Sequence, residues 1–266
     1  MAILASFFAQ QPAAPQEASL GACDPALIGT PVKTIKASKL AAQLNELAAP
    51  KDEFETTAAY ETRLAKASQA FASEQVLDME AGLYDSPTRY GGWVKYDADR
   101  GALTVDSYLL VAPLRESPWV PDFPKFVGVF LVQQDGKSLG EYSASNAFGA
   151  TFTVNRYAAK HYYVADPAWT PGTDRALLQG PPTDLTGTYL EIPMAPERAK
   201  VLREKMRFAL VATPQAPFVG VHTEHQYPKV NQPLDGDTTN HVIVADINCA
   251  LALDEKGKLL AVWPGA

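Results

Sequence analysis

The stretch HVIVADINCALALDEKGKLLAVWP, residues 241–264, carries the clearest strand pattern in the chain. Within residues 241–253 one set of alternate positions is almost wholly apolar, and successive side chains of a strand point to opposite faces, so that set should face a core. A polar loop with a glycine, residues 254–257, then precedes a second apolar run. Because glycine can take the positive φ of a tight return, the sequence predicts a C-terminal β-hairpin.

The histidine cluster of the chain lies just before this hairpin, in FVGVHTEHQYP, residues 218–228. On a strand, His222 and Glu224 share a face and the second histidine of the segment points away. A zinc site takes three or four protein ligands, so His241 or Asp246 would have to come alongside from a neighbouring strand. We interpret these residues as polar positions near a strand end; the alternative is a metal site formed by His222, Glu224 and His241.

The rest of the chain combines helical and strand patterns. Apolar residues recur at helical spacing in residues 38–47 and again after residue 56, whereas alternation at period two dominates from residue 76 onward. A strand, a helix and a strand follow one another within residues 186–212. We therefore predict one α+β domain, residues 24–266, whose N-terminal helices pack on a mostly antiparallel, curved or split β-sheet, with one β-α-β unit near the C-terminus.

Composition excludes several functional classes. The chain has 266 residues, 47% of them hydrophobic, which is enough for a substantial core. Its net charge is −7 and its pI about 5.2, which argues against non-specific nucleic-acid binding, since that needs a basic face, and against docking on anionic lipid. No apolar run reaches the length of a transmembrane helix, so we expect no transmembrane segment.

The N-terminus resembles part of a secretory signal. The apolar run MAILASFFA, residues 1–9, is followed by a Pro-, Ala- and Gln-rich stretch. We predict that residues 1–23 are a signal-peptide remnant and a disordered lead-in, and that the protein is periplasmic or secreted; the alternative is a frayed terminus without a targeting role. The segment Leu20–Cys23 also matches a lipobox, although a polar stretch separates it from the apolar run.

The chain has two cysteines, Cys23 and Cys249. An even number of cysteines in an exported protein is consistent with one disulfide, which would tie the N-terminus to the terminal hairpin. In the alternative interpretation, Cys249 is a small buried apolar residue of its strand. The sequence leaves both interpretations open.

Two proline-rich loops contain the aromatic residues Trp119, Phe123 and Trp169, which we take as candidate binding residues. For the first of these loops, which contains Trp119 and Phe123, the alternative is a cover over one end of the sheet. Asp135-Gly136 predicts a tight hairpin turn. Together with the following Lys137-Ser138, Gly136 matches the end of a phosphate-binding loop, but the earlier glycine of that motif is absent. We therefore expect no nucleotide at this segment. We also expect no other cofactor.

Two stretches, KDEFETTAAYETRLAK at residues 51–66 and SNAFGATFTV at residues 145–154, resemble segments of uncharacterised exported bacterial proteins. The resemblance implies a bacterial, exported protein and carries no activity. Since no catalytic motif is present, the sequence favours a non-enzymatic binding or envelope-associated module that contacts a protein or a small molecule. The alternative is a metal-assisted hydrolase that uses His222, Glu224 and His241.

Overall fold

The computed structural model describes residues 21–49, 51–80, 94–106, 114–116, 126–168 and 188–264. Strands dominate these ranges, with 54% of residues in strands and 20% helical. The helices are the 3₁₀ helix η1 (Pro25–Leu27), α1 (Ala37–Ala48), α2 (Thr57–Ala70) and α4 (Pro196–Leu202). The strands are β1 (Gln75–Met79), β2 (Val94–Asp97), β3 (Ala102–Asp106), β4 (Leu114–Glu116), β5 (Phe126–Ser145), β6 (Thr151–Asp166), β7 (Thr188–Pro193), β8 (Arg207–Gln226), β9 (Leu234–Leu253) and β10 (Leu259–Pro264).

The predicted α+β fold with N-terminal helices packed on a sheet is wrong. Only α1 buries a long apolar stripe, which includes Leu40 and Leu44, whereas Ala67 is the one fully buried residue of α2. The two helices therefore do not form a layer over the sheet. The structure is built instead around strands as long as 20 residues, which pair with one another along most of their length.

The large sheet has seven strands in the order β1-β8-β9-β6-β5-β4, with β10 paired to β9. Antiparallel hairpins β5–β6 and β8–β9 form most of it, and a parallel pairing of β6 with β9 joins the two hairpins. Strands β2, β3 and β7 form a separate sheet. Because β7 and β8 lie in different sheets, the predicted β-α-β unit is also wrong, although α4 does lie between these two strands in sequence.

The main core lies between α1 and one face of the large sheet, and it continues to the small sheet and α4. It includes Leu40 and Leu44 from the helix and Phe130, Val164 and Ile243 from the strands. The backbone N–H of Ser38, in the first turn of α1, donates to the side-chain carbonyl oxygen of Gln133 at 2.8 Å. This bond supplies a partner for one of the N–H groups that the start of a helix leaves free, and it fixes α1 against β5.

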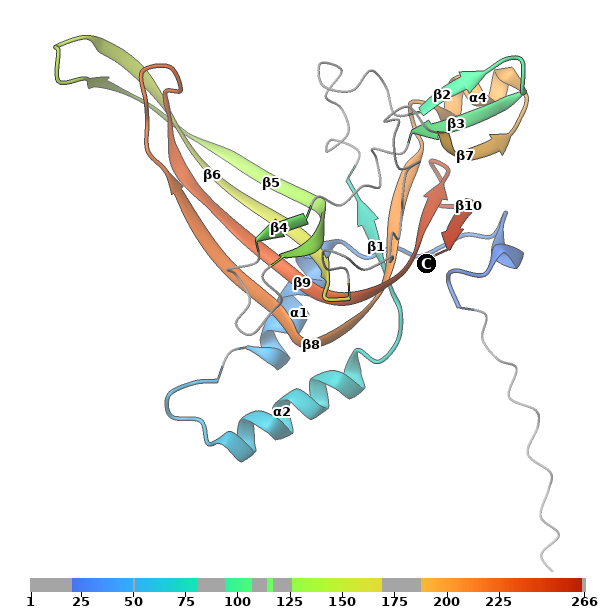
Figure 1. Cartoon of the computed structure of the whole chain (residues 1–266), viewed down its shortest axis with the longest axis horizontal. Coiled ribbons are helices and arrows are strands. Elements are labelled where there is room, and N and C mark those ends of the chain that lie inside the picture. Colours follow the sequence, from blue (N-terminus) through green and yellow to red (C-terminus); the bar gives the residue numbers. More distant parts are fainter. Residues whose placement is uncertain are drawn as a thin grey trace, which may run out of the picture.

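Beyond this core the two hairpins continue together as a projection (Figure 1). We call this part, residues 134–160 and 221–239, the arm. In the described residues, β1, β4 and β10 pair with β8, β5 and β9 only outside the arm, so the arm consists of β5, β6, β8 and β9 alone. Val154 is its one fully buried residue, so both of its faces are largely open to solvent.

Candidate functional site

Register places four side chains in one row across a face of the arm. Lys137 of β5 pairs with Ala158 of β6, Ala158 with Asp237 of β9, and Asp237 with His225 of β8. Paired residues of neighbouring strands point to the same face of a sheet. The row therefore brings together four residues from four strands, and the alanine in it is flanked by two longer charged side chains.

A second row lies directly beside the first, on the same face. It contains Asp135, Lys160, Thr239 and Thr223, again one residue from each strand. Because Ala158 is short where its neighbours are long, the β5, β6 and β9 residues of the two rows line a hollow of about 350 Å³. The arm thus carries a shallow depression with side chains of both charges around a floor of small residues.

The two aspartates at the hollow have side-chain partners among the described residues, whereas the two lysines do not. Within the described part of the chain, neither Lys137 nor Lys160 makes a hydrogen bond or an ion pair through its ammonium group. Asp135 accepts a hydrogen bond from the side-chain amide of Gln133 at 3.1 Å. Asp237 contacts the imidazole of His225. The lysine ammonium groups remain available for an external anionic group.

His225 holds two strands of the arm together. Its Nδ1 lies 2.8 Å from Oδ1 of Asp237, and its Nε2 lies 3.3 Å from Oδ1 of Asp235. The Tyr142 hydroxyl donates to Oδ2 of Asp235 at 3.0 Å, which extends the cluster to β5. Partial desolvation, followed by this hydrogen bond, raises the pKa of Tyr142. His225 also makes an edge contact with the ring of Tyr227 at a centroid distance of 4.4 Å.

The structure does not bring the three predicted metal ligands together. His222 pairs with Asn240, whereas His241 pairs with Val221, so the two histidines point to opposite faces of the sheet. Glu224 shares the face of His222. Across the residues that the structure describes, no group of three or more His, Cys, Asp or Glu side chains is placed to hold a metal ion. In the His225 cluster the two carboxylates bind different ring nitrogens, so they do not converge with the ring on one point.

His241 lies on the face that carries the hollow, next to the core. Its ring stacks on Tyr162 with centroids 4.8 Å apart and planes 11° from parallel. Both of its ring nitrogens are buried without a hydrogen-bond partner in the described structure. Desolvation, and secondarily the charge of Lys160, lowers the pKa of His241. The residue is therefore neutral near pH 7 and packs as an aromatic ring.

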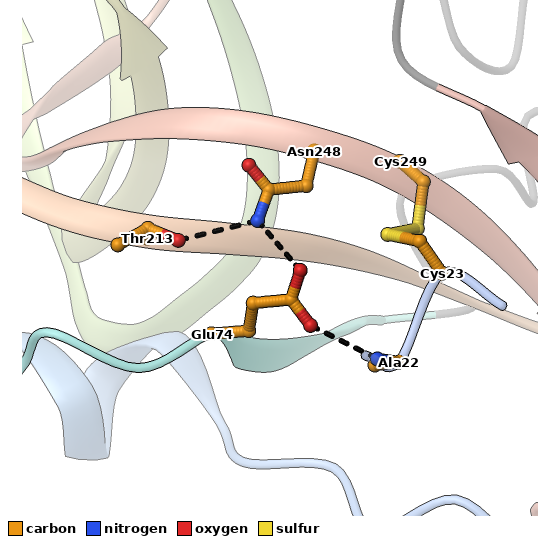
Figure 2. Close-up of a disulfide and its surroundings, with 6 residues drawn as sticks. All are labelled: Ala22, Cys23, Glu74, Thr213, Asn248 and Cys249. Carbon is orange, nitrogen blue, oxygen red and sulfur yellow. Dashed lines mark hydrogen bonds between the residues drawn. A yellow bond between two sulfur atoms is a disulfide. The ribbon is translucent and has the colours of Figure 1, made fainter. Parts of the chain in front are cut away.

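A disulfide joins Cys23, which precedes η1, to Cys249 in the C-terminal part of β9 (Figure 2). The two Cα atoms lie 5.9 Å apart, and the bond links residues 226 positions apart in the chain. Lipid attachment at the lipobox would need the same Cys23 sulfur that this bond uses. The two modifications of Cys23 therefore exclude one another.

Glu74 forms a polar node beside this disulfide (Figure 2). One carboxylate oxygen accepts from the backbone N–H of Ala22 at 2.9 Å, and the other accepts from the side-chain amide of Asn248 at 2.9 Å. Asn248 also donates to the hydroxyl of Thr213 at 3.2 Å. All of these partners come from the chain itself, so the node fixes the segment before η1 to the sheet.

Several predicted features lie outside the described residues. These are the aromatic candidates Trp119, Phe123 and Trp169, and residues 1–20 of the predicted lead-in. The charged hollow, in contrast, was not predicted. Its residues come from four separate strands, and no local motif connects Lys137 or Ala158 with Asp237 in the sequence.

No family model matches the chain, and no curated protein or solved structure is found to be similar to it. None of the helices in the described ranges is long and apolar enough to cross a membrane.

Proposed function

We propose that this chain is an exported bacterial binding protein that holds a polypeptide segment of mixed charge on the hollowed face of its arm. The observation that carries this proposal is the row Lys137–Ala158–Asp237–His225, in which a short residue opens a hollow between opposite charges. Nothing in the proposal requires catalysis. It assigns the arm a role in recognition.

The burial pattern of the arm supports this role. Hydrophobic burial stabilises a fold roughly in proportion to the apolar area removed from water, at about 25 cal/mol per Å². The arm buries only Val154 completely, so it adds little of this stabilisation to the core. A paired, hydrogen-bonded extension that contributes little to the core fits a structure used to present side chains to a partner.

The charges around the hollow define the ligand. Lys137 lies on β5 and Asp237 on β9, two strands away, and at about 4.8 Å per strand their backbones are about 10 Å apart. Lys160 and Asp135 add a second pair of opposite charges beside them. An extended peptide that carries an acidic and a basic side chain can place both groups across this distance. Charge-assisted hydrogen bonds to such groups are stronger than those between neutral groups.

The proposed location is the periplasm or the extracellular space. The apolar run at residues 1–9 supports export, and so does the disulfide between Cys23 and Cys249, because disulfides persist in oxidising compartments. The metal-assisted hydrolase has no such support. Its three residues do not share one face of the sheet.

The test uses a peptide library displayed on phage and selected on the full chain. Selected peptides should be enriched in sequences that contain both an acidic and a basic residue. The affinity of these peptides, measured by fluorescence anisotropy, should fall at least about tenfold in the Ala158→Trp variant, because the indole fills the hollow. The control is Asn155→Trp on the same strand, which pairs with Leu234 and faces the opposite side.

The two variants separate the possible outcomes. Equal loss of affinity in Ala158→Trp and Asn155→Trp would mean that the hollow is not the binding site. Selection that enriches no peptide above a panel of unrelated proteins would refute peptide binding itself.

A further inference from the structure

Exposed hydrophobic side chains gather on the arm. In the described residues ten large hydrophobic side chains are exposed, and seven of them belong to the arm. These seven are Leu139, Tyr142, Phe148, Val221, Tyr227, Val230 and Leu234. The most exposed of them, Phe148, is 95% accessible and lies in the turn between β5 and β6. The concentration of apolar groups at one end of the molecule calls for a partner that covers them.

The turn that carries Phe148 is preformed. The side-chain oxygen of Asn146 accepts hydrogen bonds from the backbone N–H groups of Phe148 and Ala150, both at 3.0 Å. Gly149 has a φ of 83°, a conformation that glycine takes at no steric cost. Phe148 is therefore held away from the body of the protein by a defined turn. Binding through a preformed turn avoids the entropic cost of ordering a loop.

The hairpin β8–β9 ends short of this turn, because its pairing with β6 begins at Leu234 and Asn155, four positions behind the start of β6 at Thr151. Its tip is closed by two reciprocal backbone hydrogen bonds between Lys229 and Gln232, both 2.9 Å long, and it exposes Tyr227 and Val230. The backbone N–H of Asn155 donates to the carbonyl of Pro233 at 2.9 Å, which ties the end of the β8–β9 hairpin to β6. Both tips point to the same end of the molecule (Figure 1).

The tips contain no carboxylate. Residues 142–155 carry no charge at all, and residues 226–234 carry only Lys229, in a chain whose net charge is −7. The nearest acidic residues along the strands are Glu141 and Asp235. Aromatic and apolar side chains without acidic neighbours are the composition that the interface of a lipid bilayer accepts. One lysine against an overall negative charge indicates zwitterionic rather than anionic lipid.

From these observations we propose that the two hairpin tips of the arm dock on the surface of a zwitterionic lipid bilayer and insert Phe148, Tyr227 and Val230 into its interface. Two separate tips without acidic residues at one end of the molecule can both contact an extended planar surface. The residues of the two tips are not those of the charged hollow. Membrane docking by the tips and peptide binding in the hollow can therefore be tested independently of each other.

The depth of insertion is limited by the first acidic residues. Glu141 lies four positions before Ser145, the last residue of β5, and at about 3.3 Å per residue this places it about 13 Å behind the strand end. Interfacial side chains enter a bilayer by about 5–10 Å. The tip of β5–β6 therefore reaches the acyl boundary while the carboxylate of Glu141 stays in water. Asp235 also stays in water, because it pairs with Arg156, one position farther from the tip than Asn155, the partner of Glu141.

The experiment is co-flotation of the full chain with phosphatidylcholine vesicles in the absence of any peptide. The wild-type chain should float with the vesicles, and Phe148→Ser should reduce its partition coefficient at least about fivefold. The double variant Phe148→Ser/Val230→Ser should reduce it further. The matched control is Phe54→Ser, which removes a phenylalanine that is 88% exposed between α1 and α2. Circular dichroism spectra identical to wild type establish that each variant is folded.

A second measurement follows insertion directly. The Phe148→Trp variant carries an additional tryptophan at the tip. Brominated phosphatidylcholine should quench the fluorescence of this added tryptophan. Absence of flotation by the wild-type chain overturns the proposal. Equal reduction of flotation by Phe148→Ser and Phe54→Ser would also overturn the proposal. Membrane binding would then come from another part of the chain, such as the apolar run at residues 1–9, which all variants retain. If a photo-crosslinker at position 148 captures one envelope protein and the chain does not bind vesicles, the partner of the tips is a protein and the bilayer proposal is wrong.

Discussion

His241 stacks face to face on Tyr162, with ring centroids 4.8 Å apart, while both of its ring nitrogens are buried without a partner. A histidine in this setting contributes to packing as a neutral ring. Protonation would place a charge where neither nitrogen has a hydrogen-bond acceptor in the described structure. The arrangement therefore couples the stability of the sheet at the base of the arm to pH.

We predict that the free energy of unfolding falls as the pH drops below about 6.5, the ordinary pKa of histidine. The pKa of His241 is lowered in the folded state by desolvation and by Lys160. The unfolded state then binds the proton more readily, so acidification favours unfolding. His241→Phe keeps the stacked ring and removes both nitrogens. Urea unfolding between pH 7.5 and 5 should show a weaker pH dependence in this variant, and parallel curves for the two proteins would contradict the prediction.

We predict that the disulfide contributes substantially to stability. A bond between residues 226 positions apart removes much of the entropy of the unfolded chain, and loss of such a bond costs about 2–5 kcal/mol. Cys23→Ala should lower the urea midpoint accordingly. Cys23 is the better position to change because Cys249 is fully buried, and its truncation would add a packing defect. Titration of the unfolded, unreduced wild-type chain should detect no thiol, and two free thiols would exclude the bond.

We predict that Leu44→Ala destabilises the protein by about 2–5 kcal/mol, the range for large-to-small changes in a core. Leu44 is fully buried between α1 and the large sheet. The control is Val201→Ala on α4, where the side chain is 54% exposed and the expected change is within about 0.5 kcal/mol. Equal effects in thermal or urea unfolding would show that α1 does not pack on the sheet as described.

The sequence by itself determined the elements that bury one face. The predicted C-terminal hairpin is confirmed: β9 ends at Leu253 and β10 begins at Leu259, directly opposite. The helix predicted after residue 56 is also confirmed: α2 begins at Thr57, and the Thr56 hydroxyl accepts from the N–H of Ala59. A strand with one buried face needs apolar residues at alternate positions, and the start of a helix needs a residue such as threonine that can accept a backbone hydrogen bond. Both patterns extend over only a few neighbouring residues, so they can be recognised in the sequence.

The tertiary structure alone decided the arm and its hollow. Asp135-Gly136 signals a turn, yet β5 runs straight through it. Gly236 lies between two aspartates in the sequence, and in β9 it lets the strand approach Tyr157 of β6, because a Cβ at this position would clash with the carbonyl oxygen of Tyr157. With both faces in water, most of the arm departs from the alternation of apolar and polar residues that the sequence shows elsewhere after residue 76. Its strands are held by backbone hydrogen bonds, which any side chain permits, so the row from Lys137 to His225 depends on a pairing that no local pattern encodes.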